Sequence, residues 1–517
     1  MRHRIPSIIL AGALACGHLL AAQAVERTDT PRHGALRVTF DPRIMTWDRQ
    51  YSPAGSQGIG AAFSGDSIAA GLPSVVRLQQ DVRALTGLAG YVASLGHELL
   101  AIRAERRVMP IRLEYGISNR LSVGVTVPIV RVEVREGYQH SPPGANLGSV
   151  PGTAADSARY RTFFDDLDAA LGALSDSIAA GAYGCPGSAA CVQAQALLAQ
   201  GQMARLTLAR AVYGTPDTAA QYLPLETSAA GRRVTAVVDA LGHALADSFN
   251  IGAFSRDTFL LPSTPLSGGE LAALYADRTS GLDLSPYGGN TLRRLRFFPG
   301  DVEVAARYRF LVRRNYAAAA TALVRLPTGH QDSPNDPFDL STGDHQLDIE
   351  GTLTQELTLW KRLWLNLSVR AGQQRPGERE RRVGPIDQPF LPATTLARLR
   401  WDPGDYVAVD FAPMYRFSPR FGAGVTAAYY TQQRDRYMFL SPQDSTVIAG
   451  LVGAPVSAGV LDAGTGIRQA RVGLAVTYMG PSLEGGFSLE RTVSGAGGPV
   501  PVATVFRIVL RQSIQLF

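Results

Sequence analysis

Apolar and polar residues alternate along residues 345–372, the segment HQLDIEGTLTQELTLWKRLWLNLSVRAG. From Leu347 to Leu359 the odd positions are mostly apolar, whereas the even positions are Asp, Glu or Thr. A period of two is that of a β-strand, and the alternation restarts after residues 360–362. The pattern predicts a hairpin with a very short turn. Each arm is long enough for a tilted membrane-spanning strand, which needs roughly nine to eleven residues.

The same alternation recurs along the chain and predicts about twelve strands. They lie near residues 35–47, 102–117, 121–134, 301–313, 316–326, 347–359, 363–370, 406–417, 421–432, 466–479, 483–492 and 504–517. Very short connections, at 118–120, 314–315, 360–362, 418–420 and 480–482, alternate with much longer ones. Short turns at one end, long loops at the other and an even number of strands are typical of outer-membrane barrels.

One predicted strand, at 121–134, contains Pro128. Apolar residues occupy the odd positions before this proline, as at Val125, and the even positions after it, as at Val132. A proline within a strand is often found at a β-bulge, which changes the face on which later residues lie. We therefore expect a bulge at Pro128.

The N-terminal residues favour a membrane barrel over a soluble β-sandwich, whose strands would also alternate. Arg2 and Arg4 precede an apolar run at residues 8–20, and residues 22–24, Ala-Gln-Ala, offer a cleavage site of small residues. This is the pattern of a Sec-type signal peptide, which we place at residues 1–24. No later segment has the roughly eighteen consecutive apolar residues of a helical span. The expected location is the outer membrane.

Residues 136–300 differ from the rest of the chain. Phe163, Leu167 and Leu171 recur at helical spacing, and residues 189–214 and 232–250 continue with helical patterns. We expect a helical extracellular insertion at 136–300, between first barrel strands with a long loop in residues 25–135 and the remaining strands in residues 301–517. The insertion is open to several interpretations: a cap, a plug in the barrel mouth, a binding module or a purely structural bundle.

Composition and charge agree with an exported protein. The chain is 45% hydrophobic, with a mean hydropathy of +0.01 and a net charge of +6. No basic stripe or nucleic-acid motif accompanies that charge, so nucleic acid is not an expected partner. Cys16 lies in the signal region, where a lipoprotein is a minor alternative. Cys185 and Cys191 are expected to form a local disulfide in an oxidising compartment, with metal binding as the weaker interpretation.

Four segments resemble a known family. They are LEYGISNRLSVGVTVPIV at 113–130, GDVEVAARYRFL at 300–311, LPTG at 326–329 and DLSTGDHQLDIE at 339–350. The chain resembles, over roughly residues 105–135 and 299–517, the outer-membrane transporters grouped with the meta-cleavage pathway of phenol degradation. The resemblance implies a barrel of about twelve strands and uptake of small, often hydrophobic compounds. It implies no catalytic residues, and the helical insertion lies outside it.

Two further clusters favour a structural interpretation. Gly65-Asp66-Ser67 resembles the Gly-Asp-Ser block of a serine esterase family, but that chemistry needs a histidine base, and the Asp-x-x-His sequence of that family is missing near the C-terminus. We expect no enzyme. A loop that is rich in turn-forming residues matches no standard calcium-binding spacing, so we expect no metal or cofactor. Its candidate ligands would be His330, Asp332, Asp336, Asp339, Asp344 and His345.

Charged residues at the predicted inward positions are candidates for the lumen wall. They are Glu303, Arg307, Arg309, Asp348, Glu350, Glu356, Arg370, Arg471, Glu490, Arg507 and Arg511. Both signs are present, which suits either a mixed-charge channel wall or a paired network that seals the barrel. The terminal Phe517 is the expected assembly signal, although the apolar residues of the last strand have the opposite parity.

The sequence therefore predicts an all-β transmembrane barrel of about twelve antiparallel strands, with an α-helical insertion in one extracellular loop. Its expected function is passive passage of small molecules, hydrophobic ones among them. The alternative is a closed barrel that serves as a surface platform, with an insertion that binds a ligand or partner. Outer-membrane lipid, the barrel-assembly machinery and a small-molecule solute are the expected partners.

Overall fold

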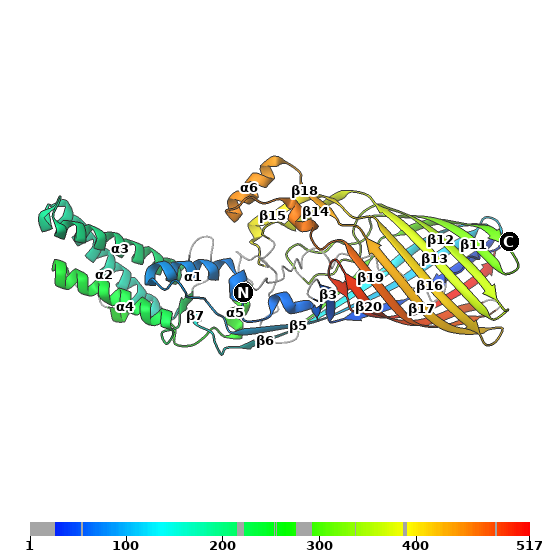
Figure 1. Cartoon of the computed structure of the whole chain (residues 1–517), viewed down its shortest axis with the longest axis horizontal. Helices are drawn as coiled ribbons and strands as arrows, with labels where there is room; N and C mark the ends of the chain where they lie inside the picture. The colour runs from blue at the N-terminus through cyan, green and yellow to red at the C-terminus, as the bar shows by residue number, and fades with distance from the viewer. Residues whose placement is uncertain are drawn as a thin grey trace.

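The computed structural model describes residues 26–516, except 53–54, 215–221, 253, 255, 276–291, 337, 386–389 and 481–482. The predicted signal peptide and Phe517 lie outside the described residues. Among the described helices, none is long and apolar enough to cross a membrane. The main feature of the fold is a closed sheet at one end of an elongated molecule, shown at the right of Figure 1.

Twelve antiparallel strands form the closed sheet, which confirms the predicted barrel. In ring order they are β1 (Ala35–Phe40) continued by β2 (Arg43–Trp47), β5 (His97–Gly116), β6 (Leu121–Ser141), β10 (Glu303–Val312) continued by β9 (Leu292–Pro299), β11 (Tyr316–Arg325), β12 (Asp348–Leu359), β13 (Leu363–Gln374), β16 (Tyr406–Arg416), β17 (Phe421–Gln432), β19 (Ile467–Met479), β20 (Leu483–Ala496) and β22 (Thr504–Gln515). β1 pairs with β5 on one side and with β22 on the other, and this pairing closes the ring.

The two faces of the wall have opposite chemistry. On β10, Val304, Tyr308 and Phe310 are exposed on the outside, whereas Arg307 is buried inside. Leu474 on β19 is 65% exposed, although it lies in the middle of the sheet. A wall that is apolar outside and charged inside fits a barrel whose outer face contacts lipid, since closure leaves no unpaired strand edge in the hydrocarbon.

The predicted bulge at Pro128 is wrong. Pro128 lies directly opposite Pro110, and the pairing of β5 with β6 continues past it without a register shift. Val130 and Val132 therefore point to the same side as Thr126 and are buried. The parity of apolar residues changes because the interior itself changes. Beyond Pro128 these inward positions join an apolar core, to which loop residues such as Phe63 and Phe338 also contribute.

That core closes the end of the barrel that carries the long loops. Phe63 packs edge-on against Phe338 and Phe390, each at a ring-centroid distance of 5.3 Å. The long loops also form three short sheets. They contain β3 (Arg49–Ser52), β4 (Gly55–Gly58) and β21 (Val500–Pro501); β7 (Leu147–Ser149) and β8 (Tyr222–Pro224); and β14 (Gly377–Arg382), β15 (Leu396–Asp402) and β18 (Arg436–Phe439), with helix α6 (Pro442–Val452) beside the last sheet.

A helical arm extends from this end, away from the barrel (Figure 1). It contains α2 (Ala154–Ala179), α3 (Ala189–Tyr213) and α4 (Ala229–His243), with α1 (Pro73–Thr86) from an earlier loop packed against α3 and α4; α5 (Gly268–Tyr275) follows in sequence. Phe163, Leu167 and Leu171 lie in the core of the arm, as their spacing predicts. Because β6 runs to Ser141 and β9 begins at Leu292, strand residues occupy both ends of the segment 136–300.

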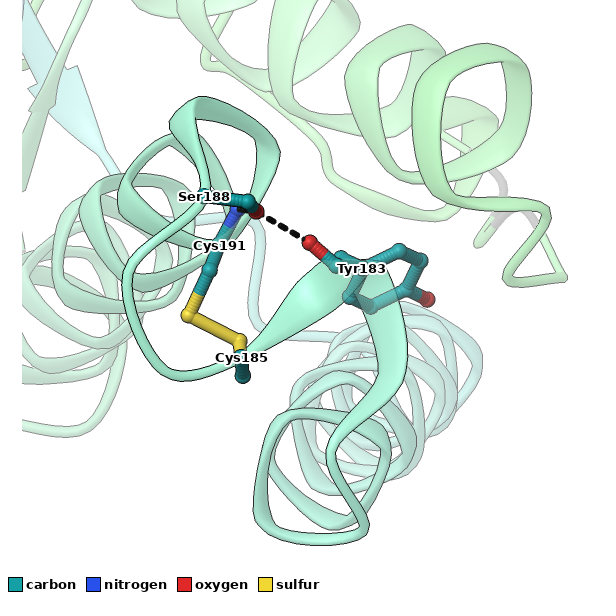
Figure 2. The surroundings of a disulfide bond; sticks show 4 residues. All are labelled: Tyr183, Cys185, Ser188 and Cys191. Carbon is teal, nitrogen blue, oxygen red and sulfur yellow. Dashed lines mark hydrogen bonds between the residues drawn. A yellow bond between two sulfur atoms is a disulfide. The ribbon is translucent and has the colours of Figure 1, made fainter.

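The expected disulfide joins Cys185, in the connection between α2 and α3, to Cys191 in the first turn of α3 (Figure 2). Their Cα atoms are 5.1 Å apart. Ser188, between them, begins α3 by accepting a hydrogen bond from the backbone N–H of Cys191 at 2.9 Å. The disulfide therefore ties the first turn of α3 to the preceding loop.

Lipid exposure of the outer wall can be tested with one substitution in two places. Leu474→Arg should impair insertion into lipid vesicles and destabilise the inserted barrel by ~2–4 kcal/mol, the cost of an arginine at the bilayer midplane. Leu206→Arg on α3 is the matched control, because Leu206 is also largely exposed, at 58%, but on the arm. Heat-dependent gel migration and urea unfolding in vesicles measure both. Equal effects at the two positions would contradict a lipid-facing wall.

Candidate functional site

The barrel encloses a cavity of about 190 Å³ in its lumen. Its lining comes from inward-pointing side chains of eight neighbouring wall strands, from residues 26 and 27 and from the loop at residues 342–344. Guanidinium and carboxylate groups dominate this lining. The charged lining residues are Glu26, Arg27, Arg37, Asp41, Arg43, Arg106, Arg112, Glu114, Asp301, Glu303, Arg307, Arg325, Asp344, Glu350, Arg370, Arg507 and Arg511.

Of the eleven lumen candidates from the sequence, the structure brings six together around this cavity. They are Glu303, Arg307, Glu350, Arg370, Arg507 and Arg511. Asp348, Glu356, Arg471 and Glu490 also lie inside the barrel, but beside the cavity, where they pair with other groups. Arg309 is half-buried on β10, outside the cavity lining. The inward positions were therefore predictable from parity, whereas the grouping around one cavity was not.

Several lining residues were not among the eleven candidates, although some of them occupy inward positions by the same alternation. Arg37 and Asp41 alternate with the outward-facing Val38 and Phe40 at the first strand, so the sequence pattern predicts that they point inward. Arg106 and Arg112 lie on β5, where apolar and polar residues alternate clearly only in the C-terminal part of the strand. The pattern therefore gave little indication of the inward orientation of Arg106. Two lining residues, Glu26 and Arg27, precede the first strand and carry no periodic signal at all.

One carboxylate holds two arginines on the seam where the barrel closes. Asp41 accepts hydrogen bonds from Arg507 Nε and Nη2 at 2.5 and 2.6 Å, and from Arg43 Nη2 at 2.5 Å. Arg43 and Arg507 are direct cross-strand neighbours on β2 and β22. Without the carboxylate between them, two positive charges would face each other in the barrel interior. Asp41 is thus the counter-ion that lets these strands pair.

A second cluster centres on Arg325 of β11. Its guanidinium lies 3.1 Å from Glu303 on β10 and 2.8 Å from Asp348 on β12. Glu350, one inward position further along β12, is 3.7 Å away and accepts a hydrogen bond from the Tyr406 hydroxyl. Each of these bonds joins different wall strands. The network stiffens the barrel and fixes where positive and negative charges face the cavity.

A segment of the chain itself lies inside the lumen. Residues 26–33 precede β1 and run from the short-turn end into the barrel, where Thr28 is completely buried. The Thr28 hydroxyl donates to Glu356 Oε2 at 2.6 Å, and Arg27 lies 2.5 Å from Glu484. The carboxylate of Glu26 lies 3.0 Å from both the Arg307 guanidinium and the Ser368 hydroxyl. Residues 26 and 27 also line the cavity, so this segment forms its floor.

The opposite end of the cavity is bounded by loop residues 327–347. Arg106 donates a hydrogen bond to the carbonyl of Thr342 at 3.3 Å, and Asp301 accepts the backbone N–H groups of Gly329 and Asp344. In the same loop, Asp332 pairs with two arginines of β14, Arg379 and Arg381. Burial alone would raise the pKa of Asp332, but these two guanidinium groups hold it below its ordinary value.

The Gly-Asp-Ser block and the Asp-rich loop make contacts of other kinds within the described residues. His97 Nδ1 lies 2.7 Å from Asp66, and within the described residues no hydrogen bond links Ser67 to a histidine. Asp339 of the Asp-rich loop pairs with Arg296 at 2.8 Å. Across the described part of the chain, no three His, Cys, Asp or Glu side chains group as metal ligands. The charged lumen is therefore the candidate functional site.

No family model and no curated protein sequence matches this chain. Among solved structures, an outer membrane channel from Pseudomonas putida F1 aligns at 8% identity and a TM-score of 0.42, over 94% of this chain and 98% of that one. A FadL homologue from Pseudomonas aeruginosa aligns at 7% identity and a TM-score of 0.28, over 99% of each chain. The transport unit of the autotransporter AIDA-I from Escherichia coli aligns at 5% and 0.32, over 99% and 100%. At this similarity none of them assigns a function.

Asp41 offers a test of the ion-pair network. Asp41→Asn should destabilise the barrel by about 3 kcal/mol, because removing one partner leaves buried arginines without their counter-ion. Asp168→Asn is the control: Asp168 pairs with Arg205 at 2.8 Å on the arm surface, where such a pair contributes less than about 1 kcal/mol. Urea unfolding in vesicles gives both values. Equal losses would mean that the lumen pairs behave like solvated surface pairs.

Proposed function

We propose that this protein is an outer-membrane channel that passes small polar molecules passively. Its wall strands would contact outer-membrane lipid after insertion by the barrel-assembly machinery, with the long-loop end outside the cell. The outward apolar belt and the closed ring of strands support the membrane setting. The cavity and its charged lining support the solute path.

The observation that carries this proposal is that residues 26–30 of the chain lie inside the lumen without being part of the wall. An eight-stranded barrel is just filled by its own side chains, and wider barrels leave room for water or a plug. Here twelve strands leave enough room for residues 26–30, in addition to a cavity of about 190 Å³. The wall side chains alone do not seal the barrel. Withdrawal of the segment would open the short-turn side of this cavity by at least the width of an extended peptide, whereas its other side is bounded by the long loops.

The lining favours polar solutes over hydrophobic ones. A hydrophobic molecule in this cavity would strip water from charged groups such as Arg106 and Arg112 and offer no hydrogen bonds in return, which is costly. Polar solutes can replace that water, and the mixture of both charge signs gives them donors and acceptors. The apolar core near Phe63 lies beyond this cavity, among the long loops. The charged lining of this cavity therefore favours polar solutes over the hydrophobic compounds that the family resemblance implies.

Single-channel recording in planar bilayers tests the proposal. The intact protein should show discrete conductance steps, and replacing residues 153–249 by a flexible linker should leave them unchanged, because the helical arm lies away from the lumen (Figure 1). Heat-dependent gel migration confirms that both forms are folded. Silence in both forms would contradict a channel and favour a surface platform. Conductance only after the replacement would make the arm a lid and contradict a path controlled by the lumen.

A further inference from the structure

The lumen recognises the backbone of residues 26–30 as well as their side chains. Arg307 on β10 donates from Nη1 to the carbonyl of Arg27 at 3.2 Å. Arg37 on β1 donates from Nη1 to the carbonyl of Asp29 at 3.1 Å. Both guanidinium groups are mostly buried and belong to rigid wall strands. Because every peptide has carbonyls at this spacing, these two contacts do not depend on the sequence of the bound chain.

The same walls match the charges of the segment. Arg307 and Arg37 use their second Nη atoms to bind carboxylates, at 3.0 Å from Glu26 and 2.5 Å from Asp29. Carboxylates on other strands bind the remaining polar groups of the segment. Arg27 forms an ion pair with Glu484 on β20, and the Thr28 hydroxyl donates a hydrogen bond to Glu356 on β12. An extended molecule with both charge signs, such as a short peptide, satisfies both walls at once.

The segment is held by contacts that another molecule can replace. The Arg27 and Glu484 side chains are 23% and 27% exposed, so their ion pair is partly solvated and contributes little by itself. The backbone joins residues 26–30 to the wall through β1. A short tether of this kind competes at an effective concentration of the order of millimolar. A free solute of the same chemistry can therefore displace the segment at comparable concentrations.

We propose that this part of the lumen is a binding site for short peptides and related extended zwitterionic solutes, and that residues 26–30 are its built-in occupant. The proposal rests on the channel function proposed above and names its solute class. With the segment bound, it closes the floor of the cavity. A zwitterionic solute that displaces residues 26–30 opens the floor of the cavity. The solute then occupies the same path through which it passes.

Replacing residues 26–31 by Gly-Ser repeats of equal length tests the plug, because the chain keeps its length but loses its charged contacts. The conductance of this variant should rise several-fold over that of the intact protein. Glu484→Gln, which removes one of the wall carboxylates that pair with Arg27, should give more frequent openings in an otherwise unchanged barrel. Glu378→Gln is the matched control, since Glu378 pairs at 2.6 Å with the exposed Arg398 in the sheet of β14 and β15.

A synthetic peptide of sequence Glu-Arg-Thr-Asp-Thr then tests the site. It should block the Gly-Ser variant in a concentration-dependent way and bind it in detergent, as measured by fluorescence anisotropy of a labelled peptide. A peptide with alanine in place of its three charged residues should do neither. Binding without conductance in any form would contradict the channel but keep the site. Conductance without block or binding, and without a rise in the Gly-Ser variant, would overturn the site and keep the channel.

Discussion

The structure depends on one constraint: hydrocarbon offers no hydrogen-bonding partner to a backbone amide, so the sheet must close on itself. Closure pairs β1 with β22, from Ala35 opposite Gln515 to Phe40 opposite Leu510. This register places the start of the first strand at the short-turn end of the barrel. Residues that precede Ala35 must then leave the wall at the rim of the lumen. The position of the internal segment follows from the pairing that seals the barrel against lipid.

Closure also decides the chemistry of the interior. With apolar side chains facing lipid, alternation puts the charged residues inside, where each must find a counter-ion or water. Asp41 between Arg43 and Arg507 shows how the seam itself is stabilised by this pairing. Arg325 does the same for β10, β11 and β12. Ion pairs in the lumen therefore contribute to barrel stability and, at the same time, arrange the donors and acceptors that a solute meets.

The parts of the fold and the lumen that the sequence predicts are those whose pattern lies within a short stretch of the chain. Alternation with period two is local, and it predicted the strands, their turns and the inward side of residues such as Arg507. Alternation could not predict what fills the interior. Val130 and Val132 face inward like Thr126, but they are buried in an apolar core that includes loop residues. In the sequence, the change of apolar parity at such a core looks the same as the change at a bulge. Helix α1 was missed although Val75, Leu78 and Val82 have helical spacing. Residues 26–33 carry no periodicity, so only the closed register reveals them.

From the sequence, the charged lumen could be either a channel wall or a seal. These two interpretations differ in whether the contacts that close the lumen lie within the wall or on the internal segment. Pairs within the wall, such as Arg370 with Asp410 at 2.7 Å, belong to strands that the lipid constraint holds in place. Contacts of Arg27 and Thr28 belong to a segment outside the sheet, which has no backbone ladder to lose when it leaves the lumen. A seal would place its closing contacts in the wall. On the short-turn side of the cavity, this barrel places them on residues 26–30, which the sheet does not hold.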